Sequence, residues 1–242
     1  GPLRLADLHA HRASSVQPLQ VKVSGATLFN MTPPTQGIAS LMILAIFDRL
    51  RLRHGIREAD DAPYLHALVE ATKQAFIVRD RYVTDPAAMT RDPLELLTQD
   101  VVVQMANRVP FDKASPWPAP NSDGDTTWMG VVDAQGRAVS MIQSIYFEFG
   151  SGVVLPKSGF WWQNRGCSFD LQAGKLRSLM PGRKPFHTLN PAMAQLDDGR
   201  LLVYGTMGGE GQPQTQAAVF SRYVWGGHNV RSAVAAPRWL LG

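Results

Sequence analysis

A hydroxyl residue stands where a loop meets the first strand of a β-rich segment. The sequence there is Gly124-Asp125-Thr126-Thr127-Trp128. A threonine is a weak nucleophile unless a base activates it, and an N-terminal threonine carries such a base in its own α-amine, whose pKa of ~7.7–8.0 lies near neutral pH. Breaking the Asp125–Thr126 bond would create that terminus, and the Thr126 hydroxyl can attack the preceding carbonyl. An ordinary β-branched strand start is the alternative.

A second candidate is the glycine-rich run from Gly205 to Gly211, between a predicted strand and a predicted helix. Glycines allow backbone N–H groups to converge on an anion. A phosphate-binding loop would end in Lys-Ser or Lys-Thr, which this run lacks, whereas an oxyanion hole needs only backbone donors. The run therefore favours an oxyanion hole, with a tight strand-to-helix turn as the alternative.

Other kinds of chemistry find little support in the sequence. One cysteine, Cys167, gives neither an internal disulfide nor a cysteine-based zinc site. His9 and His11 lie in a predicted helix, where side chains two residues apart point away from each other, so we expect no metal and no cofactor. The net charge is +4, and the basic cluster at 49–57 is typical of a solvated helix end. No apolar run approaches the ~18 residues of a membrane span; we expect no nucleic-acid or membrane partner.

Periodicity predicts mostly helices before a Pro-rich loop at 110–125 and mostly strands after it. Before the loop we expect a strand at 16–23 and helices at 3–12, 38–53, 63–81 and 93–107. After the loop we expect a helix at 213–226 and strands at 127–133, 138–147, 159–164, 192–196 and 201–206. The 242 residues are 45% hydrophobic and 18% charged, as in globular proteins. This order of elements indicates an α+β layered fold.

Several segments, in the right order, resemble the γ-glutamyltranspeptidase family. They are 31–34, 85–86, 126–133, 136–140, 149–154, 181–185, 208–209 and 236–238. The resemblance spans nearly the whole chain. It implies the four-layer αββα sandwich of N-terminal-nucleophile hydrolases and a precursor that cuts itself before a threonine. It also implies a hetero-oligomer of the resulting large and small subunits. Residues 1–125 would be the mostly helical C-terminal part of the large subunit, ending in the Pro-rich loop. Residues 126–242 would be the β-rich N-terminal part of the small subunit.

The resemblance also implies roles for individual residues. Thr126 is the nucleophile, its freed amine is the base, and Asp125 precedes the cleaved bond. Gly208 and Gly209 supply the N–H groups of the oxyanion hole. Ser144 stands where the family has threonine, and its hydroxyl would support Thr126.

The positions that hold substrate depart from the transpeptidase pattern. Arg165 and Ser168 replace the residues that bind the substrate's ammonium group. Tyr146 replaces an asparagine that helps to hold the glutamyl group, and His187 and Thr188 replace two serines that bind its carboxylate. A guanidinium repels an ammonium group but can hold a carboxylate through two parallel hydrogen bonds. These changes indicate a small, carboxylate-bearing amide as substrate.

The surroundings of Tyr146 and of 161–165, which include Asn164, resemble the oxamate amidohydrolase branch of the family. Trp161 and Trp162 either line the pocket or pack elsewhere. The chain between Phe169 and Pro181 is too short for the family's lid loop, so water is the expected acceptor. The expected activity is hydrolysis of oxamate to oxalate and ammonia in bacterial purine (uric acid) degradation. A cytoplasmic location is expected, with the periplasm as the alternative.

Other functions stay open from the sequence. Within the family, the alternatives are a γ-glutamyltranspeptidase or hydrolase and a cephalosporin acylase with a longer acyl pocket. In another class, the chain would be an uncleaved, non-catalytic binding module.

Overall fold

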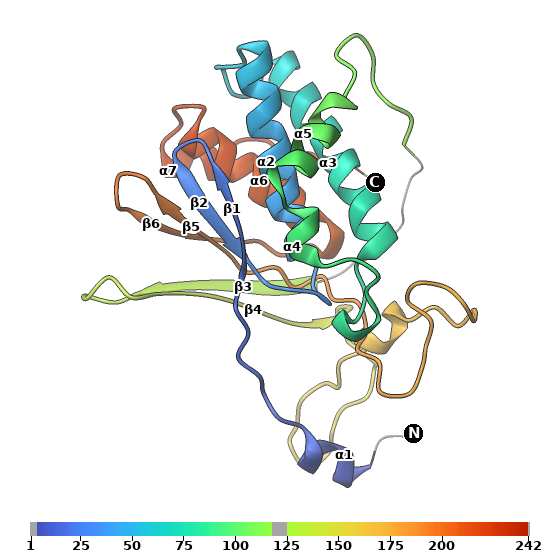
Figure 1. The fold of residues 1–242 in the computed structure, drawn as a ribbon. Helices are drawn as coiled ribbons and strands as arrows, with labels where there is room; N and C mark the ends of the chain where they lie inside the picture. The colour runs from blue at the N-terminus through green and yellow to red at the C-terminus, as the bar shows by residue number, and fades with distance from the viewer. Residues whose placement is uncertain (1–3, 118–124, 242) are drawn as a thin grey trace.

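A computed structural model describes residues 4–117 and 125–241 (Figure 1). Its centre is a four-stranded antiparallel sheet in the order β1-β2-β5-β6. The strands are β1 (Leu19–Val23), β2 (Ala26–Asn30), β5 (Ala192–Leu196) and β6 (Leu201–Tyr204). Leu28 pairs with Ala194 in the middle of the sheet. The sheet therefore joins strands that lie on both sides of residue 126 in the sequence.

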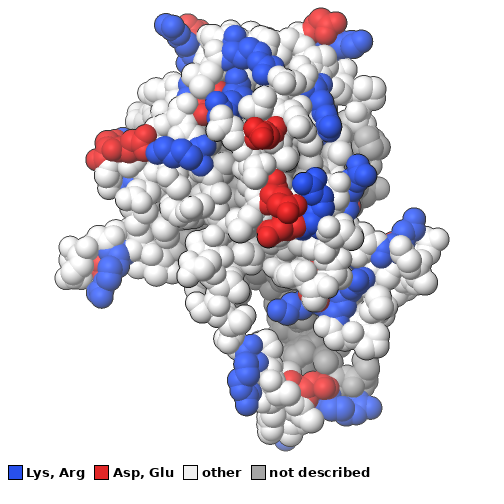
Figure 2. Space-filling model, in the orientation of Figure 1, with Lys and Arg blue, Asp and Glu red and all other residues white. Residues whose placement is uncertain are grey.

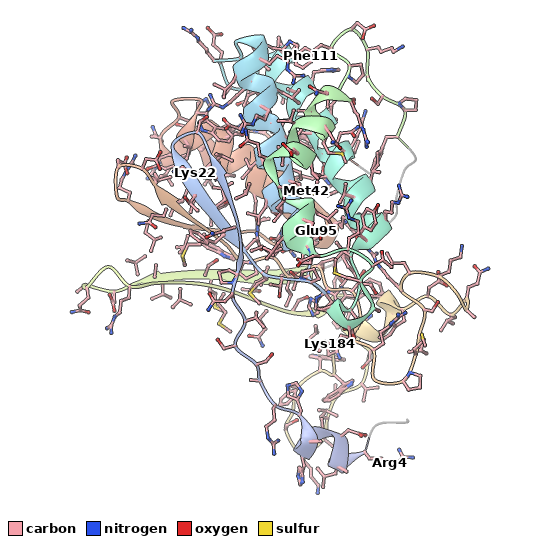
Figure 3. The ribbon with its side chains drawn as sticks, viewed as in Figure 1. Arg4, Lys22, Met42, Glu95, Phe111 and Lys184 are labelled. Atoms are coloured by element: carbon pink, nitrogen blue, oxygen red, sulfur yellow. The ribbon has the colours of Figure 1, made fainter. Side chains whose placement is uncertain are left out.

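Helix α2 (Gly37–His54) is the buried centre of the helical layer. Every residue from Gly37 to Asp48 is buried, because a helix that is apolar on all faces must be covered on all sides. Met42, labelled in Figure 3, has none of its surface exposed. The helix ends at Gly55, whose left-handed backbone (φ +64°) stops it.

Three further helices and the sheet cover α2. Asp61 caps the N-terminus of α3, since its carboxylate accepts the Tyr64 N–H at 2.7 Å. The helices that contact α2 are α3 (Ala62–Tyr82), α5 (Gln99–Asn107) and α6 (Gln212–Val224). The short helices are α1 (Leu5–Ala10), α4 (Pro93–Leu96) and α7 (Val230–Ala235). In Figure 1, α1 lies at the end of an extended segment, away from the other helices.

A separate hairpin carries the candidate nucleophile. It consists of β3 (Asp125–Val132) and β4 (Ala138–Tyr146), and Gly136 (φ +79°) makes its turn. The hairpin contacts β6 and crosses below the four-stranded sheet in the view of Figure 1. Its outer face is apolar and exposed, formed by Met129, Val131, Val139 and Met141.

The structure corrects several expected elements. The strand expected at 159–164 is wrong. This segment forms no ladder but an isolated bridge between Trp161 and Val154, and its other backbone hydrogen bonds go to scattered residues such as Val153 and Ile145. The single helix expected at 93–107 is two helices, since Thr98 adopts an extended backbone and starts α5. Strand β1 and helix α1 are shorter than expected, and β2 and α7 were not predicted. The expected loop at 110–125 falls partly outside the described residues.

Charged side chains do not form a single-sign patch on the face in Figure 2, where Lys and Arg are interspersed with Asp and Glu. Within the basic cluster at 49–57, Arg51 pairs with Asp48 at 2.6 Å and lies 4.4 Å from the Trp225 ring centroid. No group of three His, Cys, Asp or Glu side chains suited to a metal ion occurs in 4–117 or 125–241. In the same ranges, no helix has the length and apolar character needed to cross a membrane.

The burial of α2 makes a testable prediction. Leu44 has 1% of its surface exposed and Leu52, on the same helix, has 57%. We expect Leu44→Ala to lower the free energy of unfolding by about 2–5 kcal/mol, because it leaves a cavity. Leu52→Ala should change it by no more than about 0.5 kcal/mol. Urea unfolding of both variants is the measurement, and equal losses would contradict this view of α2.

Candidate active site

Thr126 lies at an irregularity of the β3–β4 hairpin. Asp125 pairs with Tyr146, whereas Thr127 pairs with Gln143, so β4 has one extra residue opposite Thr126. Bulges of this kind re-aim a side chain and are frequent beside active sites. Thr126 is 7% exposed, and its hydroxyl donates to Ser144 Oγ at 3.2 Å. The hairpin thus holds the two hydroxyls that were predicted to act together.

A cleft of about 420 Å³ opens beside this pair of hydroxyls. It reaches Thr126 and Ser144 from the outer part of the hairpin, and its other lining residues are Thr127, Met129, Gln143, Ile145, Phe147 and Glu148. The residue that carries the candidate nucleophile therefore lines an open cleft.

Arg165 is a buried cation without an acidic partner. It is 4% exposed, and its guanidinium donates to Ser168 Oγ at 3.3 Å and to Thr188 Oγ1 at 2.9 Å. Its Nε has no hydrogen-bond partner, and no carboxylate of the described residues forms an ion pair with it. Burial lowers the Arg165 pKa to about 10. A charge buried in this way is costly unless an anion compensates it.

His187 is neutral at neutral pH. Burial, with a further contribution from the positive charge of Arg165, lowers its pKa to about 4. Its Nδ1 accepts the Leu189 N–H at 3.3 Å, and its backbone bonds to Pro34 and Gln36. A neutral imidazole adds no second positive charge, so the local charge comes from Arg165.

Tyr146 lies under Arg165 and has an unusual backbone. The guanidinium carbon is 3.6 Å from the ring centroid, a cation–π contact. Its φ of +81° lies in the left-handed region that non-glycine residues rarely adopt. Its backbone N–H donates to Ser144 Oγ at 2.8 Å, and burial raises the pKa of its phenol. The strained turn thus links the Thr126–Ser144 pair to the Arg165 site.

Two neighbours of this turn also have defined positions. The Asn164 side chain accepts the Phe147 N–H at 3.2 Å, so in this structure it holds the end of β4. Trp161 is 42% exposed and packs edge-on against Phe149, with ring centroids 5.5 Å apart.

The glycine-rich run forms a tight turn between β6 and α6. Gly208 and Gly209 have left-handed backbones, with φ of +96° and +46°. The Gly208 carbonyl accepts the Gly211 N–H at 2.7 Å, and 209–211 form a 3-10 turn before α6. Glycine adopts these positive φ angles without strain because it has no side chain.

Gln36 completes a continuous set of contacts from the nucleophile to the glycine turn. Thr188 accepts from Arg165 through its hydroxyl and from Gln36 Nε2 through its carbonyl, at 2.9 Å each. Gln36 Nε2 also donates to the Gly209 carbonyl at 2.8 Å. The structure therefore connects the predicted site residues, although their catalytic and binding roles stay predictions. Gln36 was not predicted, although it follows the Thr32-Pro33-Pro34 motif of the family resemblance.

The γ-glutamyltranspeptidase family model matches residues 1–242. The chain belongs to the γ-glutamyltranspeptidase family. It is 53% identical over 241 residues to the oxamate amidohydrolase proenzyme of Klebsiella pneumoniae, covering 100% of this chain and 45% of that proenzyme. It is 38% identical to the glutathione hydrolase-like YwrD proenzyme of Bacillus subtilis, covering 99% of this chain and 45% of that proenzyme.

A solved structure gives the same fold. The crystal structure of cephalosporin acylase from Bacillus halodurans superposes with a TM-score of 0.86 at 31% identity. The match covers 99% of this chain and 43% of the acylase. The chain thus spans less than half the length of these relatives, and it has the mixed α/β fold of their family.

The depressed pKa of His187 predicts a pH dependence of stability. The unfolded chain, with a histidine pKa of ~6.5, binds more protons than the folded chain between pH ~6.5 and about 4, so stability falls as the pH drops through this window. From pH 7 to pH 4.5, wild type should lose about 2 kcal/mol more unfolding free energy than His187→Gln. The exposed His9 supplies the control, since His9→Gln should behave as wild type. Identical pH dependence of wild type and His187→Gln would contradict the burial argument.

Proposed function

We propose that the protein is a self-cleaving amidohydrolase that hydrolyses a small, carboxylate-bearing amide, oxamate, to oxalate and ammonia. One observation carries the proposal: Arg165 is a buried cation that forms no ion pair among the described residues. It is linked to the candidate nucleophile through Tyr146, whose ring it contacts, and Ser144, which bonds to both Tyr146 and Thr126. A substrate carboxylate would supply the missing negative charge. The Klebsiella pneumoniae relative is named as an oxamate amidohydrolase proenzyme, which supports the same substrate.

The hydroxyls around Arg165 support a carboxylate in particular. Arg165 donates to the oxygen atoms of Ser168 and Thr188. The proton of the Thr188 hydroxyl therefore points elsewhere and can be donated to an anion, whereas the Ser168 hydroxyl also bonds to the Tyr146 phenol. An ammonium group beside Arg165 would meet a guanidinium that forms no ion pair among the described residues, and this repulsion disfavours a γ-glutamyl substrate. His187, Tyr146 and Asn164 are proposed to complete the substrate site.

The proposed reaction has two stages. In maturation, the Thr126 hydroxyl attacks the carbonyl of Asp125, and the C–N bond breaks as the nitrogen takes a proton, which frees the Thr126 amine and leaves an ester on its oxygen. Water then hydrolyses this ester to the Asp125 carboxylate and the free Thr126 hydroxyl. In turnover, that amine takes the hydroxyl proton while the oxygen attacks the amide carbon. The N–H groups of Gly208 and Gly209 stabilise the oxyanion, with Ser144 orienting Thr126. Ammonia leaves with a proton, and water then hydrolyses the acyl-threonine ester to oxalate and free Thr126.

Water is the proposed acceptor because little chain is present to exclude it. The segment between Phe169 and Pro181 is a compact turn in which Asp170 bonds to Arg177 and Leu179. We further propose that residues 1–125 and 126–242 belong to the large and small subunits of a hetero-oligomer with a four-layer αββα sandwich. Purine degradation in the cytoplasm is the proposed setting.

A cephalosporin acylase is the second candidate, favoured by the TM-score of 0.86 to such an enzyme. It would require space for a longer acyl chain beside Arg165, where Tyr146 now lies against the guanidinium. A glutaryl amide therefore serves as a competing substrate in the experiment below.

The full-length protein should release ammonia from oxamate and leave a γ-glutamyl anilide and a glutaryl anilide intact. Thr126→Ala should abolish both cleavage, leaving one band on a denaturing gel, and ammonia release, because the nucleophile is lost. Thr126→Ser keeps a hydroxyl and should still cleave. Anilide turnover without ammonia from oxamate would refute the proposed substrate. Maturation of Thr126→Ala would refute the mechanism.

Arg165→Gln should raise the KM for oxamate by about 10- to 100-fold, the effect of a lost charge-assisted hydrogen bond, while self-cleavage stays intact. Steady-state ammonia release gives KM, and a gel gives cleavage. Arg137 provides the matched control, since it lies at the exposed hairpin turn and pairs with Asp133; Arg137→Gln should behave as wild type. An unchanged KM in Arg165→Gln would remove this residue from the substrate site.

A further inference from the structure

Gln36 is a fully buried amide whose bonds reach three separate parts of the chain. None of its surface is exposed. Its Nε2 donates to the carbonyls of Thr188 at 2.9 Å and Gly209 at 2.8 Å, and its Oε1 accepts from Arg79 at 3.1 Å. One side chain, carried at the start of α2, thus holds the segment beside Arg165 and the glycine turn together.

Arg79 fixes the orientation of this amide. It is 3% exposed in α3, and its guanidinium carbon lies 3.9 Å from the Phe76 ring centroid. It also bonds twice to Asp80, at 2.8 and 3.0 Å, and pairs with Glu210. Because a guanidinium only donates, Gln36 must turn its oxygen toward Arg79 and its NH₂ toward the two carbonyls. The flipped amide would leave those carbonyls facing an oxygen.

The glycine turn depends on these bonds for its direction. The Gly208 carbonyl is held by the Gly211 N–H and the Gly209 carbonyl by Gln36. Each peptide unit is planar and trans, with its N–H opposite its carbonyl. The Gly208 carbonyl, held within the turn, therefore sets the direction of the Gly209 N–H. Gln36 holds the carbonyl on the other side of Gly209 and so anchors the turn as a whole to the Thr188 segment. The Gly209 carbonyl also accepts the Gln212 N–H at the start of α6. Since both glycines have positive φ and carry no side chain, the bond from Gln36 is the one that ties this turn to the segment beside Arg165.

We propose that Gln36, oriented by Arg79 and with Glu210 as the second partner of that arginine, is a positioning residue for the oxyanion hole. The inference rests on the proposed function and adds a residue to its machinery that touches no reacting atom. An oxyanion donor acts through its pre-set position and direction. Loss of the anchor at the Gly209 carbonyl lets the turn shift together with its Gly208 and Gly209 N–H groups, which reduces turnover more than substrate binding.

Gln36→Met in the full-length protein tests this proposal, because methionine has a similar length and no hydrogen-bonding amide. We expect kcat for ammonia release from oxamate to fall by about 10- to 100-fold, as for a small misplacement of a catalytic group, while KM changes by less than about threefold. Gln216→Met is the matched control. Gln216 is 2% exposed and donates to the Asn190 carbonyl and accepts from Ser40, away from the glycine turn. The Gln216→Met variant should lower the urea concentration of unfolding about as much as Gln36→Met does, yet keep kcat within about threefold of the wild-type value.

A second variant covers the case in which Gln36→Met does not fold. Arg79→Lys keeps the positive charge but loses the planar fork, so kcat should again fall more than KM. Wild-type kcat in a folded Gln36→Met or Arg79→Lys protein would overturn the inference, as would an equal kcat loss in Gln216→Met. These outcomes differ from failure of the proposed function, in which the wild type itself releases no ammonia from oxamate. In that case the same kcat comparison is made on whichever anilide the wild type hydrolyses.

Discussion

Burial of α2 is the constraint on which the rest of the structure depends. A helix that is covered from Gly37 to Asp48 cannot stay in water, so α3, α5, α6 and the sheet must close around it. This closure brings the first residue before α2, Gln36, against the glycine turn that precedes α6. The hydrophobic effect therefore sets the position of a polar group, because packing of α2 determines where its N-terminus lies.

The long helices could be predicted from the sequence because their signals are local. A continuous apolar run that ends at Gly55 marks α2, and an apolar stripe after the Asp61 cap marks α3, both without reference to other elements. The short strands depend on partners instead. Strand β2 forms because β1 and β5 flank it, whereas the aromatic run at 159–164 bonds to β4 only at its end, through the Asn164 N–H and the Ile145 carbonyl, and forms no ladder. Strand formation reflects such context more than intrinsic preference, so these two segments could not be distinguished by pattern.

The candidate site also contains some residues that the sequence could predict and one that it could not. Thr126, Ser144 and Arg165 are found through residues that resemble a family, and their contacts agree with the expected grouping. The buried amide of Gln36 bonds to Thr188 and Gly209, which lie 152 and 173 residues after it in the sequence. No spacing rule connects such distant residues. Buried polar groups must find partners, but the sequence does not say which partners those are.

The antiparallel pairing of β2 with β5 gives a break in the chain before Thr126 little mechanical effect. Two strands from before that bond and two from after it form one sheet, joined at the β2–β5 pair, and α2 packs against α6 from the opposite side of the bond. Two polypeptides produced there would share a single hydrophobic core, and separating them would expose most of it. They would behave as one cooperative folding unit. A newly made terminus could then move into the site without loss of the surrounding framework.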